Sequence, residues 1–322
     1  MVSVVMAVYN GVLYLEKQLD SIRCQTVPPD EVVFCDDCST DDTPELIRQY
    51  IRKYGLQNWH LYQNEQNLGY YQNFFKAVFL ANGDTIYLSD QDDIWDPDKI
   101  RVFENIYRKH PEISMLQSNI SFIDGNGDPI QNDKPYHGIR YKGKCVRLNM
   151  MTMCKYQGSG FTMSFRRSVA ELIRNDNLHQ YEDIYKFHDI LIGLMAAAVG
   201  KCYLVQNIID KHRLHIGNST QKSGQVYIAD RTKEKQLTIL KRRMREFELL
   251  MQYCSDDAKK DVFRRFQMFA WNRKQLIEKF SFGAMAFLIK NNRYYSSKLG
   301  LITDAMYSLN MEKLLLFVYS RL

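Results

Sequence analysis

The segment TIYLSDQDDIW, residues 85–95, joins a short apolar run to three closely spaced carboxylates, Asp90, Asp92 and Asp93. The apolar part is typical of a buried strand, and the acidic part would then lie at the carboxyl end of that strand. Three carboxylates this close repel one another unless a cation lies between them, and carboxylate oxygens suit Mg²⁺ or Mn²⁺. A solvated acidic turn before the next helix is the alternative, because DPDK follows directly.

Outward from this segment, apolar strands alternate with amphipathic helices. The strands are expected at residues 2–8, 31–35, 59–63, 85–88 and 113–118. Leu15, Leu19 and Ile22 share one face of the first helix, and Asp42 or Thr43 is expected to cap the second. A third helix, over residues 70–82, is expected to close at Gly83. This alternation predicts an α/β fold with an open, mostly parallel sheet flanked by helices, which binds ligands at the carboxyl ends of its strands.

Polar residues follow each of the first four predicted strands. They are Tyr9 and Asn10, Asp36 and Asp37, Asn67 and Gly69, and then Asp90, Asp92 and Asp93. The carboxyl ends of parallel strands meet at one edge of a sheet, so we expect these residues to form one site.

The last hundred residues differ from the rest in charge and in periodicity. Residues 221–322 hold 20 Lys and Arg against 10 Asp and Glu, whereas residues 1–220 hold 23 against 27. Apolar stripes at helical spacing, beginning at Leu237 and Leu240, predict a basic helical appendage over residues 226–322 behind a domain of residues 1–225. Its basic face is either simply solvated or docks on an anionic membrane. No motif favours nucleic acid.

Other classes of protein are disfavoured by composition. No uncharged apolar stretch reaches the roughly 18 residues that a membrane-spanning helix needs, and the sequence starts without a basic leader. We therefore expect a cytoplasmic protein. Seven cysteines with a single C-x-x-C, at Cys35 and Cys38, do not suggest a disulfide framework or a zinc site.

Five blocks of the sequence, taken in order, resemble the inverting glycosyltransferases of family 2. The blocks are VSVVMAVYN, DDCSTDDT, NLGYYQNFFKAVFLANGDTIYLSDQDD, GSGFTMSFRR and FHDILIGL with YLVQNIIDKHRLHIGN. They cover about residues 1–220 and are most similar to bacterial rhamnosyltransferase-like members that build surface polysaccharides. The resemblance implies a GT-A fold, a nucleoside diphosphate sugar donor and Mg²⁺ or Mn²⁺ as cofactor.

The resemblance also implies roles for single residues. Those expected to bind the nucleotide are Ala7, Tyr9, Asp37, Asn67 and Asp90. Those expected to hold the metal are Asp92, Asp93 and His215. Those expected to bind the substrate are Gly158, Ser159 and Gly160, near the donor sugar or the acceptor, together with His188 and with Arg213, whose guanidinium would clamp the diphosphate. Some relatives carry proline or a hydroxyl residue where this chain has Ala7, which weakens the case for a side-chain contact there.

Asp189 is expected to be the catalytic base, because the resemblance places an aspartate at the start of the helix that follows the acceptor-binding region. Such a group removes the proton of the acceptor hydroxyl. Asp183, preceded by Glu182, is a competing candidate, and a simple helix cap is the structural alternative for Asp189.

The sequence thus predicts a metal-dependent enzyme that transfers a sugar, with rhamnose favoured, from a dTDP- or UDP-sugar to a growing glycan. The acceptor would be a lipid-linked saccharide at the inner face of the membrane. Two alternatives stay open. One is a phosphatase or phosphotransferase of the haloacid dehalogenase type, which also uses D-x-D, and the other is a catalytically inactive nucleotide-sugar binding protein.

Overall fold

The computed structural model describes residues 1–131, 144–155, 159–185, 187–215, 232–297, 299–311 and 315. These residues form two units. The first contains Met1–Asn149, Tyr156–Glu182 and Lys186–Leu214, and the second contains Met150–Lys155, Asp183–Tyr185 and His215–Leu322. The expected boundary after residue 225 falls within residues 216–231, which lie outside the described ranges.

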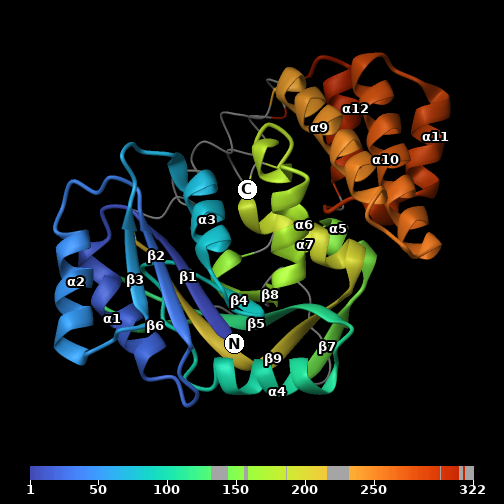
Figure 1. Cartoon of the computed structure of the whole chain (residues 1–322). Coiled ribbons are helices and arrows are strands. Elements are labelled where there is room, and N and C mark those ends of the chain that lie inside the picture. Colours follow the sequence, from blue (N-terminus) through green and yellow to red (C-terminus); the bar gives the residue numbers. More distant parts are fainter. Residues whose placement is uncertain are drawn as a thin grey trace. The chain divides into compact units, whose positions relative to one another are not determined.

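The first unit contains the strands and most of the shorter helices (Figure 1). Its strands are β1 (Val2–Val8), β2 (Glu31–Asp36), β3 (Trp59–Gln63), β4 (Thr85–Ser89), β5 (Ile113–Ile123), β6 (Pro129–Ile130), β7 (Cys145–Leu148), β8 (Met163–Arg166) and β9 (Lys201–Arg213). Its α-helices are α1 (Val12–Arg23), α2 (Thr43–Tyr54), α3 (Gly69–Leu80), α4 (Lys99–Lys109), α6 (Arg167–Asn175) and α7 (His188–Val199), with 3-10 turns η2 (Gly160–Thr162) and η3 (Leu178–Gln180).

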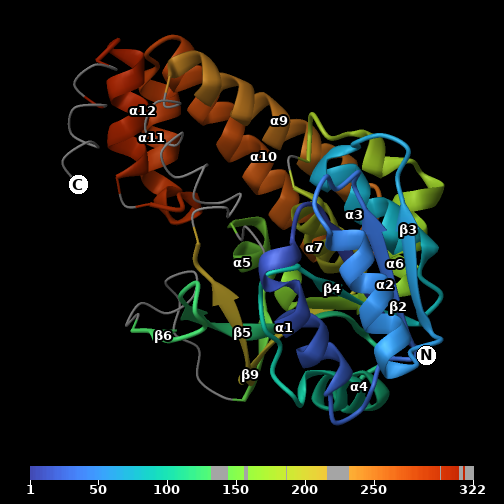
Figure 2. The ribbon, with the colours of Figure 1, turned by 90° about the vertical axis from the view of Figure 1, so that its left-hand side faces the viewer.

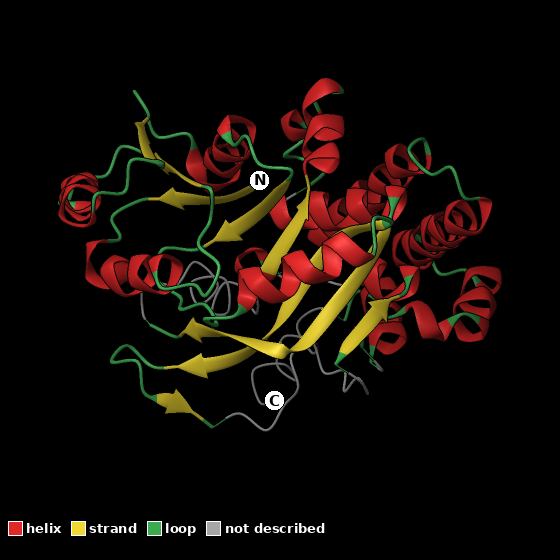
Figure 3. Cartoon of the chain, turned by 60° about the horizontal axis from the view of Figure 1, so that its bottom comes forward, coloured by secondary structure: helices red, strands yellow, loops and turns green. Residues whose placement is uncertain are grey.

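In the described part of the chain the strands form one nine-stranded sheet of order β3-β2-β1-β4-β8-β5-β9-β7, with β6 paired to β5 (Figure 3). The first four strands are parallel to one another, as the alternation of strands and helices predicts. The rest of the sheet is mixed, because β8 runs antiparallel to both of its neighbours, β4 and β5, and β7 runs antiparallel to β9. Parallel pairing joins β1 to β4, and it returns where β5 pairs with β9.

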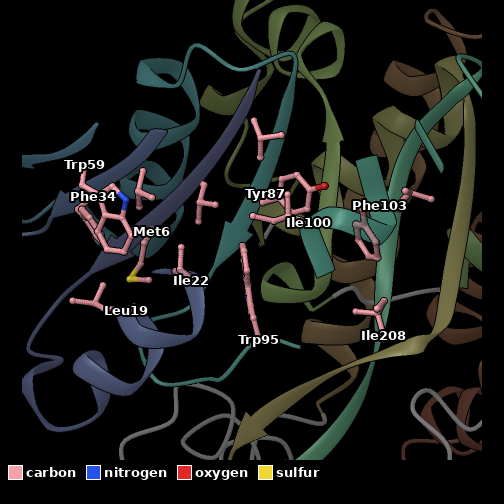
Figure 4. Packing of buried hydrophobic residues seen from close by; sticks show 14 of the residues in the cluster. Met6, Leu19, Ile22, Phe34, Trp59, Tyr87, Trp95, Ile100, Phe103 and Ile208 are labelled. Carbon is pink, nitrogen blue, oxygen red and sulfur yellow. The ribbon is translucent and has the colours of Figure 1, made fainter. Parts of the chain in front are cut away.

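Helices cover both faces of this sheet. In Figures 1 and 2, α4 lies on one side of the sheet, and α3, α6 and α7 lie on the other. Leu19 and Ile22 of α1 and Phe103 of α4 belong to the same buried apolar cluster as Met6 and Phe34 of the sheet (Figure 4). Tight packing of this kind fixes where each strand ends, and so fixes the residues that follow the strands.

Two expected helix ends differ from the structure. Asp42 stands before α2, but its side chain makes no capping hydrogen bond, and Oδ1 of Asp41 accepts the Thr43 amide instead. The third helix ends at Leu80, before Gly83. The Gly83 amide donates to the Ser3 hydroxyl, and a side chain at residue 83 would meet the β1 backbone at 2.6 Å, so glycine serves a close approach of two segments there.

The second unit is helical. It contains α5 (Met150–Lys155), α9 (Lys233–Met251), α10 (Asp257–Glu278), α11 (Phe282–Lys290), the 3-10 turn η4 (Asn292–Tyr294) and α12 (Gly300–Ser308). The α10 helix packs against α9, α11 and α12. Leu240 and Ile277 lie in its apolar core, and Arg273 forms a two-bonded ion pair with the buried Asp304. Within the described residues, none of the helices combines the length and the hydropathy that a bilayer crossing requires.

Candidate active site

The four parallel strands end side by side, as the sequence predicts. Val8 pairs with Asp36, Asp36 pairs with Gln63, and Met6 pairs with Ser89, so the residues that follow these strands lie along one edge of the sheet. Chain segments from residues 9, 37, 64 and 90 meet there.

Asp37 anchors the loop between β3 and α3. Its carboxylate accepts hydrogen bonds from the Asn64 side chain at 2.8 Å, the Leu68 amide at 2.7 Å and the Gly69 amide at 2.9 Å. The Asn67 side chain donates to the Asp37 carbonyl at 3.0 Å. A carboxylate offers about four lone-pair positions, so one position stays available for a ligand. The expected contact of Asp37 and Asn67 with a nucleotide stays a prediction.

Tyr9 is 47% exposed at the end of β1, so its ring is free to meet a ligand. The Gln91 side chain holds the Tyr9 backbone, with its Oε1 accepting the Tyr9 amide and its Nε2 donating to the Tyr9 carbonyl. Asn10 follows with a positive φ of 47°, and its side-chain oxygen accepts the Thr40 amide at 2.8 Å. Ala7 is half-buried within β1, where it pairs with Cys35.

The carboxylate of Asp93 is completely buried. Its Oδ1 lies 2.9 Å from Nδ1 of His212 and accepts the Arg213 amide at 2.9 Å, whereas its Oδ2 is buried without a hydrogen-bond partner. Burial, and then the charges of Asp93 and Asp92, hold the pKa of Asp90 well above its ordinary value. The predicted crowding of negative charge is therefore present at the end of β4.

His212, near the end of β9, contacts the acidic cluster, and no local sequence pattern connects it to Asp93. Burial opposes a charged His212, but the hydrogen bond with Asp93 and the nearby carboxylates outweigh burial and raise the pKa of His212. Its ring stacks on Phe161, with ring centroids 5.2 Å apart. The only local signal was a polar residue in a strand-like segment, because Asp93 and His212 are 119 residues apart.

Arg213 is completely buried, so its surroundings are protein groups. Its Nε donates to the Asp92 carbonyl at 2.8 Å, its Nη1 donates to the Asp124 carbonyl at 3.0 Å, and its guanidinium lies over the Tyr14 ring. These contacts hold the backbone of the acidic segment in place. The expected contact of Arg213 with a diphosphate stays a prediction.

Asp189 lies in the first turn of α7 and is 8% exposed. Burial raises the pKa of this carboxyl to about 7, although the amides of Ile190 and Gly160 work in the opposite direction. Its Oδ1 is buried without a hydrogen-bond partner. A Cβ atom on Gly160 would lie 3.5 Å from Cδ1 of Leu88 in β4 and 3.6 Å from Cβ of Asp189, so Asp189 lies near the end of β4. By contrast, the side chain of Asp183 is 71% exposed, belongs to the second unit and lies 3.8 Å from Arg245.

His188 and Gly160 form the wall beside Asp189. The His188 ring stacks on Phe74 with centroids 3.9 Å apart, both of its nitrogens are buried without partners, and burial lowers its pKa to about 3. A Cβ atom on residue 160 would lie 3.0 Å from Nε2 of His188, so a side chain larger than glycine would push the ring aside. The Ser159 carbonyl accepts the Thr162 hydroxyl, and Gly158 lies outside the described residues.

The donor set of the acidic cluster fits a hard divalent cation. Carboxylate oxygens are the ligands that Mg²⁺ and Mn²⁺ prefer, and the unpartnered Oδ2 of Asp93 supplies one at the crowded end of β4. Within the described ranges, no group of three or more His, Cys, Asp or Glu side chains is placed to hold a metal on its own. Mg²⁺ is usually held by one or two carboxylates together with substrate phosphates, so two aspartates are a sufficient protein contribution. His215 belongs to the second unit, and its expected role as a ligand stays a prediction.

A parallel sheet that gathers carboxylates at its strand ends, beside an aspartate at the start of a helix, is the arrangement of a GT-A glycosyltransferase. The family model of glycosyl transferase family 2 matches residues 3–173. The chain therefore belongs to glycosyltransferase family 2.

Curated relatives agree with this assignment. An uncharacterized glycosyltransferase of Nostoc sp. is 24% identical over 225 residues, which are 68% of this chain and 66% of that protein. An uncharacterized glycosyltransferase of Methanocaldococcus jannaschii is 32% identical over 149 residues, 46% of this chain and 50% of that protein. Chondroitin synthase of Escherichia coli is 24% identical over 192 residues, 59% of this chain and 28% of that protein. The chain thus spans less than two thirds of the length of these relatives.

Two solved structures share the fold. TarS residues 1–349 of S. aureus, in complex with UDP-GlcNAc, superposes with a TM-score of 0.66 at 16% identity and covers 99% of this chain and 91% of that one. The mannosyltransferase PcManGT of Pyrobaculum calidifontis, in complex with GDP-Man and Mn²⁺, has a TM-score of 0.55 at 15% identity and covers 96% of this chain and 86% of that one. At these identities the likeness establishes the GT-A fold, which confirms the fold class expected from the sequence.

Proposed function

We propose that this glycosyltransferase moves a sugar, with inversion, from a dTDP- or UDP-sugar to a hydroxyl group of a growing, lipid-linked surface polysaccharide. The observation that carries the proposal is the buried carboxyl of Asp189, whose pKa is raised to about 7 beside the acidic end of β4. A general base is most effective when its pKa lies near the working pH, because it is then both ionised and strongly basic.

In this proposal Asp189 removes the proton from the acceptor hydroxyl. The acceptor oxygen forms a bond to the anomeric carbon while the bond from that carbon to the diphosphate oxygen breaks on the opposite face, which inverts the configuration. The neutral imidazole of His188, with two unpartnered nitrogens beside Gly160, would hydrogen-bond to the sugar or the acceptor there. Arg213 would support the diphosphate, chiefly by holding the backbone of Asp92.

The nucleotide would bind over the ends of β1 and β2. The exposed ring of Tyr9 would stack on the base, beside the backbone around Ala7, and Asp37 would accept a hydrogen bond from the N3–H of uracil or thymine. Asn67 holds the same loop, and Asp90 would contact the ribose.

Asp92 and Asp93 would hold Mg²⁺ or Mn²⁺, with His215 as a further ligand. When bound, the cation would neutralise the charge that develops on the departing nucleoside diphosphate. The complex of PcManGT with GDP-Man and Mn²⁺ supports a divalent cation, and the complex of TarS with UDP-GlcNAc supports a nucleotide-sugar donor. Rhamnose is favoured on the sequence resemblance alone.

The helical region over residues 226–322 would hold the enzyme at the inner face of the cytoplasmic membrane, where lipid-linked acceptors lie. On α11, Phe282 is 81% exposed and Ile289 is 54% exposed. The two residues are seven positions apart and therefore lie on the same face of the helix. Exposed Lys279, Lys290 and Arg293 flank this face, which suits an anionic lipid surface.

The purified chain, mixed with Mg²⁺ or Mn²⁺ and a panel of dTDP- and UDP-sugars, tests this function. A donor that raises the melting temperature and releases nucleoside diphosphate in the presence of an acceptor glycan supports it. Binding without any release would instead indicate an inactive nucleotide-sugar binding protein. Hydrolysis of a simple phosphomonoester would indicate the phosphatase alternative, which the family assignment disfavours.

A further inference from the structure

Lys99 and Asp210 form a completely buried ion pair in the first unit. Lys99 is the first residue of α4 and Asp210 lies in β9, and neither side chain has any exposed surface. The Nζ atom of Lys99 lies 2.7 Å from Oδ2 of Asp210, donates to the Phe161 carbonyl at 2.7 Å, and lies over the Trp95 ring. The ammonium group is therefore fully surrounded by partners.

Asp210 links two further segments of the first unit. Its Oδ2 also accepts the Ser118 hydroxyl from β5, and its Oδ1 accepts the Asp96 amide at 3.0 Å. The pair thus joins the start of α4, the strands β5 and β9, the segment after the acidic cluster and the η2 turn.

Burying such an ion pair in the core costs free energy of desolvation. Burial lowers the pKa of Lys99 and raises the pKa of Asp210, so in each case the penalty exceeds the attraction of the partner. Apolar side chains of similar volume often stabilise a core as well as a buried ion pair does. A charged pair is better explained by what it holds in place.

Lys99 and Asp210 each lie next to a segment that carries residues of the proposed site. Phe161, whose carbonyl accepts the Lys99 ammonium, follows Gly160, where a Cβ atom would lie 3.6 Å from Cβ of Asp189. Burial raises the pKa of Asp189, and the Gly160 amide acts against burial and lowers it. Asp210 lies two residues before His212, which contacts Asp93 and stacks on Phe161. The contact between Lys99 and Asp210 therefore connects the turn beside Asp189 with the strand end that contacts the acidic cluster.

We propose that Lys99 and Asp210 are positioning residues that hold the Gly160–Thr162 turn against Asp189 and the end of β9 against Asp93. This inference rests on the proposed role of Asp189 as the base. The pair would set the basicity of Asp189 through the Gly160 amide and would contact neither the donor nor the acceptor.

The double variant Lys99→Met/Asp210→Asn tests the inference without leaving a lone buried charge. The quantity measured is the pKa of Asp189, obtained from a ¹³C NMR titration of the full-length protein labelled at aspartate carboxyl carbons. The Asp189 signal is assigned by its absence in Asp189→Asn. Because the Gly160 amide would no longer be held against the carboxylate, we expect this pKa to rise by about one unit. An unchanged or lowered pKa in the folded double variant would overturn the proposal.

Ser3→Ala is the matched control. Its hydroxyl is equally buried and accepts the Gly83 amide, but it lies near the amino-terminal end of β1, away from the site. The control should lose stability and leave the pKa of Asp189 unchanged. If the double variant does not fold, Lys99→Gln/Asp210→Asn leaves no buried charge, keeps the contacts of residue 210 to Ser118 and Asp96 possible, and is expected to show a smaller shift in the same direction. No shift in that folded variant contradicts the proposal.

The NMR readout needs no substrate, so it separates this inference from the proposed function. If Asp189→Asn retains sugar transfer, the assignment of the base is wrong, and the positioning of the carboxyl by Lys99 and Asp210 is still decided by the pKa. If transfer depends on Asp189, the acidic limb of the pH–rate profile of the double variant should move to higher pH by the same amount.

Discussion

The side-chain amide of Gln91 forms two hydrogen bonds of 3.0 Å with the backbone of Tyr9, one to its N–H group and one to its carbonyl. The two residues are 82 positions apart, and the contact ties the end of β4 to the end of β1. Gln91 therefore positions the end of β1, whereas the aspartates of the same segment place their negative charges close together. Gln91 was missed among the candidate site residues because its partner is a backbone group.

Replacing Gln91 with alanine should weaken donor binding about 5- to 20-fold, because Tyr9 would no longer be held beneath the base and each lost hydrogen bond contributes about 0.5–1.5 kcal/mol. Isothermal titration with the preferred dTDP- or UDP-sugar measures this effect. Gln49→Ala, on the exposed surface of α2, should bind the donor as the wild type does. Equal affinity in Gln91→Ala would show that Tyr9 does not contact the nucleotide.

Asp189→Asn should reduce transfer by about 10²- to 10⁴-fold while leaving donor binding intact, because general-base catalysis is typically of this size. For the wild type, activity should rise with pH through about 7, where the Asp189 carboxyl loses its proton. Steady-state rates between pH 5 and 9 measure both effects. A flat profile over that range would assign the base to another group.

Asp189→Asn should also stabilise the folded protein at high pH. The folded-state pKa of Asp189, about 7, lies above its ordinary value of 3.8, so the folded protein binds this proton more tightly than the unfolded chain does. Stability contributed by the bound proton is thus present below about pH 4 and is lost as the pH rises to about 7. Asp189→Asn should therefore gain up to about 4 kcal/mol over the wild type at pH 8, and little at pH 4. Urea unfolding at the two pH values measures the difference.

Local sequence patterns were sufficient for the first half of the fold. Each of the strands β1 to β4 is a short apolar run bounded by polar residues, and three-residue and four-residue spacings such as Leu15, Leu19 and Ile22 place one face of α1 in the core. Because four successive parallel strands must end at one edge, the positions of Tyr9, Asp37 and Asp90 followed from strand ends alone.

The second half of the site depends on pairs of residues that no local pattern connects. β8 has only four residues and inserts antiparallel between β4 and β5, so neither the mixed sheet nor the approach of η2 to Asp189 follows from periodicity. Asp93 meets His212, and Lys99 meets Asp210, only because β9 crosses back to pair with β5. In hindsight, one feature of the sequence points to this pair. Asp210 occupies a buried position of β9, where an apolar residue is the rule.

Asp92→Ala should abolish the part of donor binding that depends on Mg²⁺ or Mn²⁺, because it removes a carboxylate from the crowded end of β4. Titration of the nucleoside diphosphate with Mn²⁺ and with excess chelator separates the two contributions to binding. Asp257→Ala, whose side chain is 99% exposed in the second unit, should retain the full Mn²⁺ effect. If Mn²⁺ does not affect donor binding in the wild type, the acidic cluster does not act through a cation.

The double variant Phe282→Glu/Ile289→Glu should lose most of its binding to vesicles that contain anionic lipid, and transfer to a soluble acceptor should be unchanged. Each apolar side chain that enters the lipid interface contributes about 1.5–3 kcal/mol, and each nearby Lys or Arg contributes about 1 kcal/mol, so binding should also weaken as salt is raised. Co-sedimentation with phosphatidylserine vesicles and with neutral phosphatidylcholine vesicles measures both contributions. Leu13→Glu is the matched control, because Leu13 is 76% exposed and apolar but belongs to the first unit. Vesicle binding that survives the double variant would exclude the α11 face as the contact, and a wild-type dimer that the double variant converts to a monomer would show that a second copy covers this face instead of a membrane.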